Sequence, residues 1–298
     1  MTDKIVGIVA KKDHPRSSEL ADQIIKKLND LSIKYVLETH TAERLKADGF
    51  SYNPLKIVDK SEICAETDPI IILGGDGTLI SVCHFATTKN NTVVGVNLGT
   101  LGFLTEITVA EMLPILEQVL QGSAKTEKRS LLSCKLTEGK STEHHKELKA
   151  FNDIVITKGT LSRVFGIEVY IDNEFATTIQ GDGIIIASPC GSTAYSLAAG
   201  GSIVHPQVEA LLITPICPHS LNSRPLVVPG KSTIRLKLSS RAPDETIFLT
   251  SDGQQGEIFT KHTEAIIKLS DDGINFAKSP SKNYFEVLAN KLHWGTRS

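Results

Sequence analysis

Apolar and polar positions along the first 125 residues alternate in the order expected of strands followed by helices. Lys4–Ala10 is an apolar run rich in β-branched residues, which predicts a buried strand. The apolar residues that come next recur at helical spacing and therefore share one face: Leu20, Ile24, Ile25, Leu28 and Leu31. Ser17 and Ser18 precede this face and offer the predicted helix an N-cap.

Further strands and helices are predicted in the same part of the chain. The strands are Lys34–Glu38, Ile70–Leu73 and Thr92–Leu98, and the helices are Thr78–Thr87 and Val109–Gln121, the second of which ends at Gly122. Such alternation predicts a doubly wound α/β domain, in which helices cover both faces of a parallel sheet. Ligands of these sheets bind outside the carboxyl ends of the strands.

After about residue 125 the pattern changes to closely spaced strands with little helix. The predicted strands are Lys128–Leu136, Phe151–Lys158, Val164–Ile171, Glu174–Gln180, Gly183–Ser188, Ser232–Leu238, Thr246–Thr250 and Glu264–Leu269. Turn signals separate many of them, which is typical of an all-β sandwich. A final helix is predicted over Asn283–Trp294. We therefore expect an α/β domain over residues 1–125, a β-rich domain over 126–275 and a C-terminal helical segment over 276–298.

Composition narrows the class of protein. The chain has 298 residues, of which 40% are hydrophobic and 22% charged, so it can bury a core without disulfides or metals. Because 32 Lys and Arg are balanced by 34 Asp and Glu, the molecule as a whole lacks the basic field of a non-specific nucleic-acid binder, and only a local basic patch is compatible with the composition. The five cysteines are scattered, with no CxxC pair, which indicates reduced thiols. No apolar run approaches the ~20 residues that span a bilayer, so we expect a soluble cytoplasmic protein without membrane partners.

The first candidate for chemistry is Gly74-Gly75-Asp76-Gly77-Thr78, which directly follows a predicted strand. Its glycines let backbone N–H groups approach a ligand closely, and the helix start beyond them favours phosphate oxygens. The Walker and dinucleotide glycine patterns are both absent. Asp76 would repel phosphates unless a divalent cation bridges them or the carboxylate faces a substrate hydroxyl, and both arrangements suit phosphoryl transfer. In the alternative interpretation, Asp76 only caps the helix.

A second cluster combines Gly181-Asp182-Gly183 with the small and hydroxyl residues that follow at 184–201. Such a stretch lets a flat ring lie close to the backbone, and Tyr195 could stack on a base or line a pocket. The alternative is a hairpin turn followed by a short helix, with Tyr195 in the core.

Polar side chains near the start of another predicted strand form a third cluster. Asn152-Asp153 place an amide beside a carboxylate, which together can hydrogen-bond ribose hydroxyls. Lys158 and Arg163 lie close by in the sequence and could offset ligand phosphates. The alternative for Asn152-Asp153 is a β-bulge or a strand-start turn, and the alternative for Lys158 and Arg163 is that they are exposed cations on a strand face. Asp252-Gly253-Gln254 is primarily a hairpin signal.

Five segments occur in a recognisable order: GGDGT at 74–78, GVNLGTLGFLTE at 95–106, FND at 151–153, GDGIIIASPCGSTAYSLAAGG at 181–201 and ITPICPHSLNSRPLVVP at 213–229. Together they resemble the NAD kinase family, whose members use ATP to phosphorylate the adenosine-ribose 2′-hydroxyl of NAD and so produce NADP. The resemblance covers nearly the whole chain and is weakest in the first sixty residues and in the 138–147 loop. Lipid kinases, sphingosine kinases and phosphofructokinases share only GGDGT, and the 181–201 segment is far more specific.

The resemblance implies an N-terminal α/β domain, a C-terminal β-rich domain and a last helix that returns to the first domain. It also implies a homodimer or homotetramer, with NAD bound between the domains. ATP is the implied phosphoryl donor and brings Mg²⁺ or another divalent cation with it. No residues are evident as ligands of a permanent metal.

Site residues follow from the same resemblance. Asp76 is the implied general base, and Gly74, Gly75 and Gly77 frame the phosphates. The other implied nucleotide contacts are His84, Asn152, Asp153, Arg163, Gln180, Asp182, Thr193, Ala194, Tyr195, Ser196, Leu197, Ala198 and Gln254. Three of these positions depart from the common pattern: Asp153 stands where many relatives have Glu, His84 where Arg is common and Gln180 where a cation is frequent.

Two other functions share part of this pattern. A lipid or sphingoid kinase would need an apolar acceptor site, and the sequence has no basic amphipathic helix or adjoining hydrophobic stretch to supply one. A non-catalytic NADP(H)-binding sensor would be indicated by the loss of Asp76, which is present. Hydrolase chemistry is disfavoured because GxSxG and zinc-ligand spacings are both absent.

Overall fold

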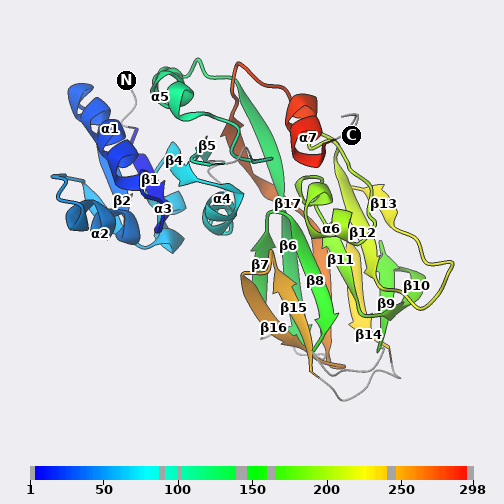
Figure 1. Ribbon diagram of the computed structural model, residues 1–298. Helices are drawn as coiled ribbons and strands as arrows, with labels where there is room; N and C mark the ends of the chain where they lie inside the picture. Colours follow the sequence, from blue (N-terminus) through cyan, green and yellow to red (C-terminus); the bar gives the residue numbers. More distant parts are fainter. Residues whose placement is uncertain are drawn as a thin grey trace. The chain divides into compact units, whose positions relative to one another are not determined.

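The computed structural model describes residues 4–86, 91–99, 102–138, 146–159, 165–239 and 246–293 (Figure 1). The chain divides into two compact units. The first unit comprises residues 1–128 and 272–298, and the second comprises residues 129–271.

Parallel strands form the centre of the first unit, in the order β3-β2-β1-β4-β5. Figure 1 labels β1, β2, β4 and β5. Their bounds are β1 Val6–Ala10, β2 Tyr35–Glu38, β3 Lys56–Val58, β4 Ile70–Gly74 and β5 Thr92–Asn97. Beside β5 lies the end of a long strand, β17 (Thr263–Ala277), whose Asn275 and Phe276 pair with it in parallel. The strand order reverses between β1 and β4, and this switch point is where doubly wound sheets bind ligands.

Helices cover both faces of this sheet. They are α1 (Ser17–Asp30), α2 (Thr39–Ala47), α3 (Lys60–Glu66), α4 (Asp76–Cys83) and α5 (Met112–Gln121), the last preceded by the 3-10 turn η1 (Val109–Glu111). The apolar faces of α1, α2 and α5 share one core with alternate strand residues such as Ile8 and Val94. On the other face, Gly7 approaches Ile63 of α3, and Gly95 approaches Leu79 of α4. The expected doubly wound α/β architecture is confirmed.

Local details of this unit differ from the sequence prediction. Ser17 and Ser18 do not cap α1, because Arg16 occupies the N-cap and both serines are buried in the first turn. The Ser17 hydroxyl donates to the Lys11 carbonyl at 2.7 Å and the Ser18 hydroxyl to Asp48 Oδ2 at 2.7 Å, so they tie the helix to neighbouring loops. The elements α2, β3 and α3 were not predicted, since they are short and carry few buried apolar residues.

The second unit is a β-sandwich. One sheet has the order β13-β12-β11-β8-β15-β16, and the other places β10, β9, β14 and β17 side by side, with β6 pairing with β17 and β7 with β6. The bounds are β6 Thr126–Glu138, β7 Lys146–Ala150, β8 Asp153–Lys158, β9 Phe165–Ile171, β10 Glu174–Gly181, β11 Gly183–Ala187, β12 Ala210–Ile216, β13 Leu226–Pro229, β14 Ile234–Leu238, β15 Ile247–Ser251 and β16 Gln255–Phe259. Ile156 and Ile186 of one sheet and Phe165 and Ile267 of the other belong to a single buried core, which confirms the sandwich-like prediction.

Short helical elements and the last helix complete the described chain. The 3-10 turn η2 (Cys190–Thr193) and helix α6 (Tyr195–Ala198) follow β11, and α7 (Tyr284–Leu292) begins after the N-cap Asn283. Thr87, Val164 and Trp294, at which predicted elements began or ended, lie outside the described residues. All five cysteines are described, and none of them forms a disulfide. Among the described helices, none is long and apolar enough to cross a membrane.

Candidate active site

The glycine-rich loop of the first unit lies at the carboxyl end of β4, beside the switch point of the sheet. Gly74 ends the strand, Gly75 is the N-cap of α4, and Asp76 is the first residue of that helix. Gly77 belongs to the same first turn. The N–H groups of this turn have no partner within the helix, so they can donate to phosphate oxygens.

The Asp76 carboxylate is held by the N–H groups of residues 103–105 and by the Thr105 hydroxyl. Oδ2 accepts the Phe103 N–H at 2.9 Å, while Oδ1 accepts the Leu104 N–H at 3.2 Å, the Thr105 N–H at 3.1 Å and the Thr105 hydroxyl at 3.0 Å. The alternative in which Asp76 caps α4 is wrong, because Gly75 occupies the N-cap and the Asp76 carboxylate bonds to residues 103–105. Since a carboxylate oxygen offers about two lone pairs, Oδ2 keeps the capacity to accept a proton.

The segment that holds Asp76 is itself tied to β5. Asn97 donates its N–H to the Ile107 carbonyl at 2.8 Å and its side-chain amide to the Thr105 carbonyl at 3.2 Å. Gly102 approaches so closely that a Cβ there would overlap Asp76 Oδ1 and lie 2.6 Å from Thr105 Oγ1. The close approach therefore requires glycine at position 102.

A second carboxylate, Asp252, builds the turn in which Asn152 and Asp153 lie. Its Oδ2 accepts the Phe151 N–H at 2.7 Å, and its Oδ1 accepts the N–H groups of Asn152 and Asp153, each at 2.8 Å. The Asp252 N–H in turn donates to the Asp153 carbonyl at 3.0 Å. Asp252 itself adopts a positive φ of 48° in the β15–β16 hairpin. The strand-start turn expected from the sequence is present, and a distant side chain holds it in place.

Asp153, the first residue of β8, is only 5% exposed. Burial, and then the negative charge of Asp252, raise the pKa of the Asp153 carboxyl to about 7. Near neutral pH this carboxyl is therefore partly protonated. In its protonated form it donates a hydrogen bond as well as accepting them, which an ionised carboxylate does not.

We expect Asp153→Asn to raise the free energy of unfolding relative to wild type at pH 8 and to change it much less at pH 4. Because the folded pKa of about 7 lies above the unfolded value, the unfolded chain binds fewer protons between these pH values. Wild-type stability therefore falls as pH rises towards 7, by at most about 1.4 kcal/mol per pH unit from this group. Urea unfolding of both proteins from pH 4 to 8 measures the difference. A pH-independent difference would contradict the assigned pKa.

The end of β11 and the turn η2 lie against the Asn152 turn. The Ser188 N–H donates to the Asn152 carbonyl at 2.8 Å, and the Ser188 hydroxyl donates to the Phe151 carbonyl at 2.7 Å. A Cβ at Gly191 would overlap the Asn152 main chain. The structure thus brings the Asn152 turn and residues 188–191 together, a contact that the sequence did not predict.

Helix α6 follows directly and carries Tyr195–Ala198, with Ala194 at its N-cap and Thr193 ending η2. Tyr195 is 47% exposed, so the alternative that places it in the core is wrong. Ser196 is buried, and its hydroxyl lies 2.8 Å from that of Thr214 on β12. The aromatic ring is therefore available to a ligand, while its neighbour anchors the helix.

Other predicted contacts lie elsewhere within their units. Asp182 precedes β11 and pairs with Lys158 at 2.7 Å, at the opposite end of the strand from the Asn152 turn, roughly 13 Å away at about 3.3 Å per residue. Gln180 is an exposed residue near that same end, whereas Gln254 lies in the hairpin of Asp252. His84 is the C-cap of α4, at the far end of the helix from Asp76. Arg163 lies outside the described residues.

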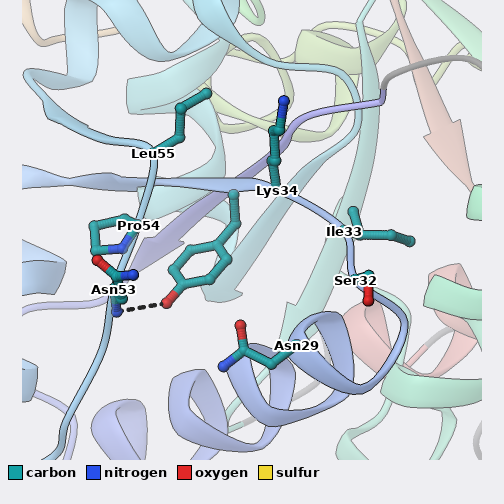
Figure 2. Close-up of a pocket in the computed structure, with 8 residues that line it drawn as sticks. Asn29, Ser32, Ile33, Lys34, Asn53, Pro54 and Leu55 are labelled. Carbon is teal, nitrogen blue, oxygen red and sulfur yellow. Dashed lines mark hydrogen bonds between the residues drawn. The ribbon is translucent and has the colours of Figure 1, made fainter.

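One pocket of about 420 Å³ lies apart from these groups, between the end of α1 and the start of β2 (Figure 2). Asn29, Lys34 and Asn53 are among the residues that line it, and the Asn53 N–H donates to the Tyr35 hydroxyl at 2.9 Å. Tyr35 begins β2, so the pocket is at the amino ends of the strands. Asp76, by contrast, follows the carboxyl end of β4, so the pocket and Asp76 are at opposite ends of the parallel strands.

The residues that orient the site are not evident from the sequence pattern. Asp252-Gly253 is a hairpin signal, and no local motif indicates the roles of Gly102 and residues 103–105. The GTLGFLTE segment offered one signal, because a glycine-rich stretch that follows a strand end often marks close backbone approach. Within the described ranges, no group of three or more His, Cys, Asp or Glu side chains is arranged to hold a metal ion.

Comparison with known proteins gives a consistent result over both units. Residues 6–124 match the ATP-NAD kinase N-terminal domain, and residues 151–279 match the ATP-NAD kinase C-terminal domain. The chain is 41% identical over 295 residues to the NAD kinase of Geotalea daltonii, covering 99% of this chain and all of that protein. It is similarly 40% identical over 295 residues to the NAD kinase of Geobacter sp. strain M21, with the same coverage.

Solved structures agree with these sequence matches. Yeast NADH kinase, in complex with NADH, superposes with a TM-score of 0.88 and 29% identity over 99% of this chain and 89% of that one. An NAD kinase from Archaeoglobus fulgidus, in complex with ATP, has a TM-score of 0.73 over 97% of this chain and 98% of that one. At 22% identity, this second likeness concerns the fold.

Proposed function

Because the chain belongs to the ATP-NAD kinase family, we propose that Asp76 is the general base with which it phosphorylates the 2′-hydroxyl of the adenosine ribose of NAD. The protein is an enzyme that phosphorylates NAD, and ATP is its phosphoryl donor. One observation carries the assignment of the base. Asp76 Oδ2 accepts the Phe103 N–H and keeps a lone pair for a proton, at the carboxyl ends of the parallel strands where ligands bind.

In the proposed reaction, the ribose 2′-oxygen forms a bond to the γ-phosphorus of ATP as the bond to the β,γ-bridging oxygen breaks. The hydroxyl proton passes to Asp76 Oδ2, and ADP leaves with the electron pair of the broken bond. The glycine loop and the first turn of α4 donate N–H groups to the phosphates, where negative charge develops. NADP is the expected product.

The second unit is proposed to bind the dinucleotide. Asn152 and Asp153 are suited to ribose hydroxyls, because the amide and the partly protonated carboxyl both donate and accept hydrogen bonds. The half-exposed Tyr195 is suited to stack on a ring, and the other residues of α6 are proposed contacts beside it. Five further nucleotide contacts are proposed by resemblance alone: Asp182, Gln180, Gln254, His84 and Arg163.

The divalent cation is proposed to arrive with ATP. Mg²⁺ is usually bound by one or two carboxylates and by substrate phosphates, and it keeps several waters. The phosphates of ATP and water would supply its ligands, and the glycine loop would hold those phosphates. When bound, the ion would neutralise phosphate charge. By resemblance we also propose a cytoplasmic homodimer or homotetramer, which gel filtration with light scattering would test.

The direct test is purified protein incubated with Mg·ATP and NAD, with the product detected by an NADP-specific dehydrogenase. We expect NADP to form with ATP and to be absent when the divalent cation is chelated. Folded protein that binds NAD in calorimetry without turnover would instead indicate a sensor. Protein that neither binds nor converts NAD would overturn the function and call for a screen of lipid acceptors.

Gly102→Ala is expected to lower kcat about tenfold or more, because the added methyl would displace the Asp76 carboxylate from its donors. Gly99→Ala is the matched control in the same segment, since a Cβ there meets nothing within 4 Å. Steady-state kinetics of the two variants, with circular dichroism to compare folding, measure the effect. Equal activity of both variants would show that the close approach at position 102 does not orient Asp76.

A further inference from the structure

Lys278, just after β17, lies between two carboxylates of the first unit. Its Nζ is 2.9 Å from Glu106 Oε2 and 3.2 Å from Glu127 Oε2, and all three side chains are less than one-fifth exposed. The other carboxylate oxygen of Glu106 accepts the Ser279 N–H at 3.0 Å. Both carboxylate oxygens of Glu106 are thus held, one by the Lys278 ammonium group and the other by the N–H of the next residue, Ser279.

Residues 278–282, here called the C-terminal clamp, hold the segment beyond Glu106 as well. Lys282 Nζ donates to the Glu106 carbonyl at 3.0 Å. The hydroxyls of Ser279 and Ser281 donate to Glu111 Oε1 at 2.6 and 2.7 Å. Burial alone would raise the pKa of Glu111, but these hydroxyls and Thr108 hold that pKa at about 2. The C-terminal clamp therefore holds residues 106–111 in place through the carboxylates of Glu106 and Glu111 and through the Glu106 carbonyl.

The clamped segment begins where the donors to Asp76 end. Thr105, which precedes Glu106, donates both its N–H and its hydroxyl to Asp76 Oδ1, at 3.1 and 3.0 Å. The N–H bonds to Oδ1, including that of Leu104 at 3.2 Å, are longer than the 2.7–2.9 Å typical of strong charge-assisted bonds. A small displacement of this segment would weaken them. Asn97, which lies on β5, restrains the segment by its bond to the Thr105 carbonyl. The C-terminal clamp restrains the segment by its bonds to Glu106.

We propose that Glu106, held by Lys278, is a positioning residue for Asp76. It fixes the segment 103–105, whose donors orient the carboxylate that accepts the substrate proton. This inference rests on the proposed role of Asp76 as the general base. In the competing interpretation, Lys278 and its two carboxylates only stabilise the first unit, and Glu106 has no special relation to the reaction.

A matched pair of variants, Glu106→Gln and Glu127→Gln, separates the two interpretations. Each removes one carboxylate charge beside the same ammonium group and leaves Lys278 with the other. Only Glu106 adjoins the donors of Asp76. We expect Glu106→Gln to lower kcat about tenfold, with KM for NAD and ATP changed by less than about twofold. Glu127→Gln should stay within about twofold of wild type in all three constants.

The lysine provides a further readout. Lys278→Met should reproduce the loss of kcat, and Lys278→Arg should restore most of it. A stabilising role alone would lower the melting temperature of both glutamine variants and leave the kcat of Glu106→Gln equal to that of Glu127→Gln.

The outcomes also distinguish this inference from the function on which it rests. An active Asp76→Asn protein would remove the general base and the positioning role together. An inactive Asp76→Asn protein, with equal kcat in Glu106→Gln and Glu127→Gln, would overturn only the positioning role. If Glu106→Gln does not fold, Lys278→Met carries the test, since it removes the cation that holds the Glu106 carboxylate. Unchanged kcat in that variant would then overturn the proposal.

Discussion

Asp76→Asn is expected to lower kcat at least about a hundredfold while NAD still binds. An amide does not accept the hydroxyl proton, so the proton transfer proposed for Oδ2 is lost. The amide oxygen of Asn can still accept from Leu104 and Thr105, and only the Phe103 N–H loses its acceptor. The variant should therefore fold, and its defect should lie in kcat.

Steady-state kinetics and calorimetry with NAD would measure this split between catalysis and binding. Asp59→Asn is a suitable control, because Asp59 also lies between a strand and a helix of the first unit without a side-chain cap bond. That control should keep wild-type activity. Full activity in a correctly folded Asp76→Asn protein would end the assignment of the general base.

Asp252→Ala should both destabilise the protein and impair NAD binding. The substitution leaves the N–H groups of Phe151, Asn152 and Asp153 without their acceptor. An unsatisfied buried donor costs about 1–3 kcal/mol, and relief of the repulsion on Asp153 offsets part of the loss. We expect the free energy of unfolding to fall by about 2–4 kcal/mol and KM for NAD to rise about tenfold or more.

Urea unfolding and the kinetics of NAD phosphorylation measure the two effects of Asp252→Ala. Asp172→Ala is the matched control, since Asp172 also has a positive φ in a hairpin and accepts one N–H, that of Thr233 at 2.8 Å. It should lose about 1 kcal/mol without a change in KM. If Asp252→Ala had wild-type stability and KM, the turn at Asn152 would not depend on this carboxylate.

The fold class and the place of the glycine loop could be predicted from the sequence because both depend on short-range information. Buried strands such as Ile70–Gly74 are continuous apolar runs, and α1 shows a clear apolar face. A glycine-rich stretch directly after β4 must lie at the carboxyl end of that strand. The short polar helix α2 was not predicted, because only Thr41, Ala42 and Leu45 are buried and they make no clear apolar face in the sequence. Packing against the sheet stabilises this helix.

The sequence by itself determined the two architectures, the identity of the chemical groups and the loop that presents Asp76. Only the tertiary structure decided what those groups do. Asp76 is oriented by residues 103–105 and not by its own helix, and Asp252 reaches the Asn152 turn from a hairpin about one hundred residues later. Asp153 is partly neutral near pH 7 because burial and a second carboxylate surround it. Hydrogen-bond geometry and desolvation arise between segments that are distant in the chain, so no local pattern of residues records them.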